Sequence, residues 1–298
     1  MGLFLGSLQQ GLIYALLAMG VYLSFRVLNV PDLTADGSFT FGMAVSAVLT
    51  GLGHPLLGLL GALLAGGLAG AVTGFLQTKA KVAPILAGIL TMSGLYTVNM
   101  AVQGGKPNVS LLGSGTLFSL FDALGLDKNV GRTVVPLLAA GLLLGLLTLF
   151  FHTHLGLCIR ATGSNEAMLR SSSVDVDAMK LTALAISNGC VALSGGLLAQ
   201  YQGFADVSSG VGTVVIGLAS VIIGEAIFGR RSVGASLLSA AVGAILYRLV
   251  IAAALRWSVF PAYALKLVSA VIVALALSIP AIRAALALRR AKREARHA

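Results

Sequence analysis

Charge is what this sequence most lacks. Only 10% of its 298 residues are charged, 57% are hydrophobic, and the mean hydropathy is +0.97. Soluble domains carry about 25% charged residues, so a chain this poor in charge cannot cover a water-facing surface. The composition excludes an ordinary soluble domain and indicates an integral membrane protein.

Cysteines and catalytic motifs are also scarce or missing. Cys158 and Cys190 provide neither a disulfide framework nor metal-ligand spacing. The sequence contains no phosphate-binding GxxxxGKS or GxxxxGKT loop, no HExxH, no CxxC and no GxSxG. We therefore expect a chain that is not an enzyme, hydrolyses no ATP and binds no metal or other cofactor of its own.

Long apolar runs are what the sequence has in abundance. A helix needs roughly 20 apolar residues to cross about 30 Å of hydrocarbon, and none of the runs alternates as strands of a membrane barrel do. We predict an all-α integral membrane fold with about nine transmembrane helices (eight to ten) in one permease-type domain over residues 1–298. The predicted spans are 5–25, 37–53, 56–78, 82–104, 132–152, 180–202, 211–229, 232–255 and 261–283. Of these, 37–53 and 211–229 are short, and 37–53 is a candidate for a broken or re-entrant helix.

The distribution of basic residues predicts the orientation. If the N-terminus lies outside, the outer flanks receive only Lys106, Lys128, Arg132 and Arg256. The cytoplasmic side receives Arg26, Lys79, Lys81, Arg160, Arg170, Lys180, Arg230, Arg231 and the basic tail 284–298. Because Lys and Arg accumulate in cytoplasmic loops, we predict an N-out/C-in orientation. The net charge of +10 is then a topology signal and does not indicate nucleic-acid binding.

Two connections are longer than the others. Residues 105–131 are predicted to form an outer loop, and residues 153–179 a cytoplasmic one. Within the second, Asn165 to Leu169 form a short helical pattern, with Asn165 as a possible N-cap and Glu166 in the first turn. The alternative is a solvated linker.

Glycines in one predicted span recur at a helical interval. Gly66, Gly70 and Gly74 repeat every four residues and so share one helix face. Small residues let another backbone approach closely. The pattern predicts close helix packing, with a pore or subunit contact as the alternative.

Polar and ionisable residues inside the apolar runs are candidates for a translocation path. Charges within a membrane are costly and suggest function by default. Glu225 lies toward the inner end of its span, where it either pairs with a basic residue near Arg230 and Arg231 or acts as a gate. The uncharged residues either bond neighbouring helices or line a path for a polar solute. The path candidates are Asp32, Tyr96, Asn99, Gln103, Asn188 and Glu225.

Three stretches resemble one family of permeases. They are residues 11–45, which contain PDLTADGSF, residues 156–199, which contain GLCIRATGSNEAMLR, and residues 215–249, which contain VIGLASVIIGEAIFG. Together they resemble the ABC-transporter permeases for ribose-type sugars and branched-chain amino acids. With ILTMSGLYTVN at 89–99, they look most like an uncharacterised branch of that superfamily, some of whose members are linked to aromatic amino acids.

This resemblance implies partners and a coupling site. The chain would be an importer subunit in the bacterial cytoplasmic (inner) membrane. It would pair with a second copy of itself, with a cytoplasmic ATPase dimer that holds ATP and magnesium, and with an extracytoplasmic solute-binding protein. The loop 153–179 would be the coupling element that docks on the ATPase. The coupling candidates are Arg160, Ala161, Gly163, Asn165, Glu166, Met168 and Arg170.

Two other classes of function remain open from the sequence. One is a secondary carrier or channel that works alone and uses Glu225. The other is a membrane scaffold that transports nothing. Uptake that requires a separate ATPase separates the importer from both.

Overall fold

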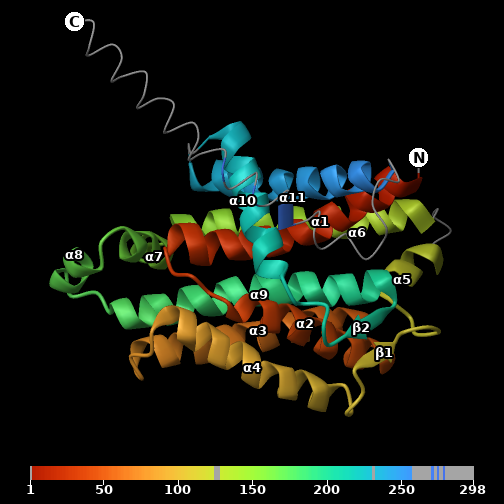
Figure 1. The fold of residues 1–298 in the computed structure, drawn as a ribbon, viewed down its shortest axis with the longest axis horizontal. Helices are drawn as coiled ribbons and strands as arrows, with labels where there is room; N and C mark the ends of the chain where they lie inside the picture. The colour runs from red at the N-terminus through yellow and green to blue at the C-terminus, as the bar shows by residue number, and fades with distance from the viewer. Residues whose placement is uncertain are drawn as a thin grey trace, which may run out of the picture.

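The computed structural model describes residues 2–123, 128–229 and 232–256, with isolated residues at 270, 271, 274 and 278. Most long helices run along the longest axis of the molecule, so their ends gather at two opposite ends of the bundle (Figure 1). The predicted span 261–283 lies almost wholly outside the described residues, and the tail 284–298 entirely so. The other eight predicted spans each coincide with a helix.

The N-terminal part supplies four long helices and a π-helical turn. The elements are α1 (Gly2–Tyr22), the π-helix η1 (Leu23–Val27), α2 (Thr34–Gly51), α3 (Pro55–Thr78), α4 (Pro84–Val102), β1 (Asn108–Ser110) and α5 (Leu117–Ala123). The rest of the described chain contains α6 (Lys128–His152), α7 (His154–Ser164), α8 (Glu166–Ser171), α9 (Val176–Gln202), β2 (Phe204–Asp206), α10 (Thr213–Phe228) and α11 (Val233–Arg256).

Six segments in the described residues are long and apolar enough to cross a membrane. They are Phe4–Val27, Pro55–Thr78, Pro84–Val102, Asn129–His152, Val176–Gln202 and Val233–Ala254. Helix α10 is a shorter apolar helix, and α2 is also short and carries several buried polar residues. The chain is therefore a multi-pass α-helical membrane protein. The number nine and the N-out/C-in orientation stay predictions.

Helix α9 lies at the centre of the bundle, where it packs against α1, α2 and α3 (Figure 1). The glycine face of α3 packs against it: a Cβ on Gly66 or Gly70 would collide with the backbone of Asn188 or Leu184. A Cβ on Gly74 would come within 2.8 Å of the Leu181 Cα. The predicted close packing of this face is thus confirmed. The opposite face of α3 exposes a row of leucines, as a lipid-facing surface requires.

Both long connections contain more structure than the sequence analysis predicted. The outer loop 105–131 includes β1, α5 and the start of α6, and β1 pairs antiparallel with β2. The loop 153–179 is mostly helical, because α7 and α8 fill it before α9 begins. The all-α fold class is confirmed, and this two-stranded ribbon is a local addition that was not predicted. Three-residue strands are too short to produce a periodic pattern, and their pairing joins distant parts of the chain.

Candidate functional site

The candidate residues gather in two places. One is the arm, which we define as α7 and α8 (residues 154–171), at one end of the bundle (Figure 1). The other is the polar seam, a line of buried polar side chains between helices. The seam consists of Asp32, Thr34, Ser38, Thr73, Thr91 and Asn188.

Side-chain caps set the start of both arm helices. The Thr153 Oγ1 accepts a hydrogen bond from the Gly156 amide at 3.3 Å, and the Asn165 Oδ1 accepts one from the Met168 amide at 3.1 Å. Asn165 has extended backbone angles, so the chain turns between α7 and α8 there. The predicted short helix, its Asn165 N-cap and Glu166 in its first turn are confirmed.

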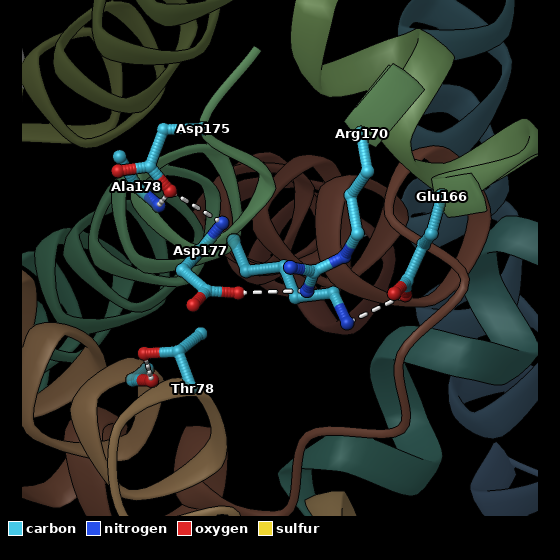
Figure 2. Close-up of polar contacts among 8 residues, drawn as sticks. Thr78, Glu166, Arg170, Asp175, Asp177 and Ala178 are labelled. Atoms are coloured by element: carbon cyan, nitrogen blue, oxygen red, sulfur yellow. Dashed lines mark hydrogen bonds and ion pairs between the residues drawn. The ribbon is translucent and has the colours of Figure 1, made fainter. Parts of the chain in front are cut away.

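Two ion pairs join α8 to the first two turns of α9 (Figure 2). The Lys180 Nζ lies 2.5 Å from the Glu166 Oε1, and the Arg170 Nη2 lies 2.9 Å from the Asp177 Oδ1. Two of the predicted coupling residues, Glu166 and Arg170, are thus bonded within the chain. Both contacts connect α8 to α9.

The start of α9 is itself capped, beside these ion pairs. The Asp175 Oδ1 accepts hydrogen bonds from the amides of Asp177 and Ala178 at 3.0 and 3.1 Å (Figure 2). The bond from Ala178 holds the pKa of the Asp175 carboxyl below its usual value. Asp175 therefore stays ionised at the helix N-terminus, where negative charge is favoured.

The other coupling candidates differ in how far they are exposed. Met168 is 65% exposed on α8, while its neighbour Leu169 is buried. Gly163 touches η1 so closely that a Cβ would overlap the Val27 carbonyl. Ala161 is half-buried in α7, and Arg160 is exposed. Met168 is thus the large apolar side chain that α8 presents to the outside.

The centre of the polar seam is a buried carboxylate–amide pair. The Asn188 Nδ2 donates to the Asp32 Oδ2 at 2.6 Å, and the Ser38 Oγ donates to the Asn188 Oδ1 at 2.7 Å. The other Asp32 oxygen accepts from the Thr34 amide at 2.9 Å, which caps the start of α2. Asp32, Ser38 and Asn188 are each 0% exposed. The pair therefore fixes the start of α2 against the middle of α9.

Three threonines extend the seam across neighbouring helices. The hydroxyls of Thr34 and Thr73 lie 2.7 Å apart, and the Thr73 hydroxyl donates to Thr91 at 2.9 Å. These bonds link α2, α3 and α4. Buried polar groups without hydrogen-bond partners are costly. Here each threonine hydroxyl is the partner of the next one, so all three are hydrogen-bonded.

A second carboxylate, the half-buried Asp36, caps α10. Its Oδ2 accepts from the Gly212 amide at 2.8 Å, and its Oδ1 accepts from the Val214 amide at 2.8 Å and the Thr213 hydroxyl at 2.9 Å. Helix α10 therefore begins against α2, in the body of the bundle. Asp36 was not among the predicted site residues. Its position four residues after Asp32, directly before the predicted membrane segment 37–53, is the signal that could have identified it.

The remaining path candidates do not join the Asp32–Asn188 pair. Tyr96 and Asn99 line a cavity of about 50 Å³ together with Asp36 and Thr40. In the described chain, the Asn99 Oδ1 and both polar side-chain atoms of Gln103 are buried without a hydrogen-bond partner. Tyr96, in contrast, is 58% exposed.

Glu225 lies apart from the seam and pairs with a basic residue. The Arg26 Nη2 lies 2.7 Å from the Glu225 Oε2, and the Glu225 side chain is only 10% exposed. Arg26 belongs to η1, which places the pair at the arm end of the bundle. Arg230 and Arg231, expected near Glu225, lie outside the described residues. Among those described, no group of three His, Cys, Asp or Glu side chains could hold a metal ion.

Comparisons with known proteins agree with this architecture. A family model described as the permease component of branched-chain amino acid transport systems matches residues 3–277. A tyrosine transport system permease protein of Clostridioides difficile is 35% identical over 185 residues, which cover 62% of this chain and 60% of the relative. The ribose import permease of Escherichia coli strain K12 is 29% identical over 181 residues, 60% of this chain and 55% of the relative.

One further relative, an uncharacterised protein of Rickettsia prowazekii, is 34% identical over 192 residues, 63% of this chain and 65% of that protein. The chain thus matches less than two thirds of the length of these curated relatives. No solved structure matches it. The family match covers almost all of the described bundle, including the arm and the polar seam, so this chain belongs to the family of branched-chain amino acid transport permeases, an ABC-type family with sugar and amino acid transporters among its members.

Proposed function

We propose that this chain is the membrane-spanning subunit of an ABC importer. Two copies would enclose a path for a small solute, and a separate cytoplasmic ATPase dimer would drive alternating access. An extracytoplasmic binding protein would deliver the solute. The chain would lie in a bacterial cytoplasmic membrane with its N-terminus outside and its C-terminus inside.

The arm is the observation that carries this proposal. A short helix that transmits force must be held firmly and must present a surface to its partner. Helix α8 meets both conditions, since two ion pairs connect it to α9 while the Met168 side chain is exposed on its surface. Exposed methionines suit protein contacts because the side chain is apolar and adaptable. The sequence has no ATP-binding loop of its own, which is consistent with an ATPase on another chain.

The charges at the two ends support the proposed orientation. Among the described residues, the arm end carries Arg26, Lys79, Lys81, Arg160, Arg170 and Lys180. The opposite end carries Lys106, Lys128, Arg132 and the last residue of α11, Arg256. An excess of basic residues favours the cytoplasmic side, which is where an ATPase would meet the arm.

The solute is proposed to be an amino acid or a molecule of similar polarity. The relatives include permeases named for tyrosine and for ribose, and both solutes need hydrogen-bonding groups along their path. The buried Asn99 and Gln103 have unused hydrogen-bonding atoms within the described chain, and Tyr96 and Asn99 share a cavity. These residues are the proposed solute contacts.

Replacement of Met168 tests the proposed ATPase contact. The Met168→Asp variant places a charge on the outward face of α8 and should abolish co-purification with the co-expressed ATPase. Leu112→Asp is the matched control, because Leu112 is 90% exposed at the opposite end of the bundle and should leave co-purification unchanged. Equal ATPase recovery from both variants would contradict the docking role of α8.

Uptake measurements separate the importer from a carrier that works alone. Proteoliposomes with the whole complex should accumulate labelled solute only with ATP inside and the ATPase present; L-tyrosine and ribose are the first probes. Uptake by this chain alone, driven by an ion gradient and lost in Glu225→Gln, would instead establish the secondary carrier. The observed Arg26–Glu225 pair gives Glu225 a structural role and does not favour that alternative.

A further inference from the structure

A pocket beside the arm has a chemistry that neither the solute path nor the Met168 contact uses, although one of its residues, Arg160, is also a coupling candidate. It has a volume of about 250 Å³ and opens onto the surface of the protein. Its walls come from the end of α1, from η1, from α7 and from the start of α11. The lining residues are Tyr22, Arg26, Val27, Arg160, Ser164, Ser232, Val233 and Ser236. We name it the arginine pocket.

The arginine pocket carries positive charge. The Arg26 charge is balanced by Glu225, 2.7 Å away, whereas Arg160 has no ion pair with any described residue. The N-terminus of α11 adds partial positive charge at the same wall, where Ser232 caps the Ala235 amide at 3.2 Å. In the sequence, Arg230 and Arg231 directly precede this cap.

A serine hydroxyl on the wall also makes no hydrogen bond with the described residues. Ser236 is only 5% exposed and lines the pocket. Its amide donates to the Ser232 carbonyl at 2.9 Å and its own carbonyl accepts from Ser239 at 2.8 Å. Within the described residues its Oγ makes no hydrogen bond. A guanidinium, a free hydroxyl and a helix N-terminus that converge on one cavity form a phosphate-binding arrangement.

The pocket lies at the level of the ends of two membrane-span candidates. Tyr22, Arg26 and Val27 lie at the end of the first membrane-span candidate, and Val233 and Ser236 at the start of the last one in the described chain. Lipid headgroups lie at this level, and basic pockets between helices on the cytoplasmic side bind anionic headgroups. We propose that the arginine pocket binds a phosphate group, supplied by an anionic phospholipid or by a soluble phosphate.

Native mass spectrometry of the purified full chain tests this site. Phosphatidylglycerol is added in detergent, with phosphatidylcholine as the neutral-headgroup comparison. Wild type should retain phosphatidylglycerol, and Arg160→Gln should bind it at least about tenfold more weakly, because a charge-assisted hydrogen bond is lost. Ser236→Val should also weaken binding. Lys79→Gln removes a charge at the same end, outside the pocket, and should bind like wild type.

Competition with inorganic phosphate identifies the source of the bound phosphate group, and thermal unfolding is the control for folding. Excess inorganic phosphate should displace phosphatidylglycerol only if the site takes soluble phosphate, and equilibrium dialysis with labelled phosphate should then show binding that Arg160→Gln removes. Retention of the lipid in excess phosphate assigns the site to the headgroup. Thermal unfolding checks that each variant is folded. Equal phosphatidylglycerol and phosphate binding by wild type, Arg160→Gln and Ser236→Val would overturn the proposal.

Discussion

The polar seam and the arm use the same kinds of side chain under opposite conditions. In the seam, Asp32 and Asn188 bond each other with no solvent exposure. In the arm, the Glu166 and Arg170 side chains are 45% and 56% exposed while they form their ion pairs. Water competes for the arm contacts and cannot compete for the seam contacts. Burial therefore decides which contacts stabilise the fold and which only position a surface.

The largest effect should come from the centre of the seam. Asn188→Leu removes the side-chain amide that donates to Asp32. Because Asp32 is fully buried, no water molecule can replace the lost hydrogen bond. We expect the free energy of unfolding to fall by about 3 kcal/mol, measured by thermal or denaturant unfolding in detergent. Asn188→Gln is the comparison, because it keeps the amide. An unchanged stability for Asn188→Leu would contradict the buried pair.

A smaller effect is expected from the glycine contact beside the seam. Gly70→Ala forces a methyl group against the Leu184 carbonyl and should cost about 2 kcal/mol through overpacking. Gly67→Ala is a matched control on the same helix, since a Cβ there would meet only the Ala185 oxygen at 3.7 Å. If both variants unfold at the same temperature, α3 and α9 are not packed as described.

The cap on α10 should contribute less again. Asp36→Ala removes the acceptor for three bonds at the start of that helix, and loss of a side-chain cap costs about 1 kcal/mol. Hydrogen exchange of the Gly212 and Val214 amides should accelerate in this variant. Asp36→Asn keeps one acceptor oxygen and should have an intermediate effect.

The arm should show the smallest effect on stability. Glu166→Gln breaks the contact with Lys180, and an exposed ion pair contributes less than about 1 kcal/mol. We expect unchanged unfolding together with faster proteolysis within residues 154–171, because α8 loses one of its two anchors. Lys180→Gln should give the same result. A large loss of stability in either variant would remove the contrast between arm and seam.

The sequence predicted the helices better than their contacts. Long apolar runs determine where a helix can span, so the positions of eight predicted spans matched observed helices. The N-cap at Asn165 was also predictable, because capping depends on residues close in sequence. The bonds from Asp32 to Asn188 and from Asp36 to α10 join distant segments, and no local pattern encodes them. Tyr96 and Asn99, two of the path candidates, line one cavity, whereas Glu225 lies apart from the seam and pairs with Arg26.

The two anchors of α10 have a mechanical consequence. Its first turn is bonded to Asp36, and Glu225 near its last turn is bonded to Arg26. Both anchors belong to the short segment 26–36, which joins α1 to α2 and which Gly163 of the arm touches at Val27. Any displacement of the segment 26–36 would therefore act on both ends of α10. The arm contacts this segment at Val27, so the segment connects the arm to α10.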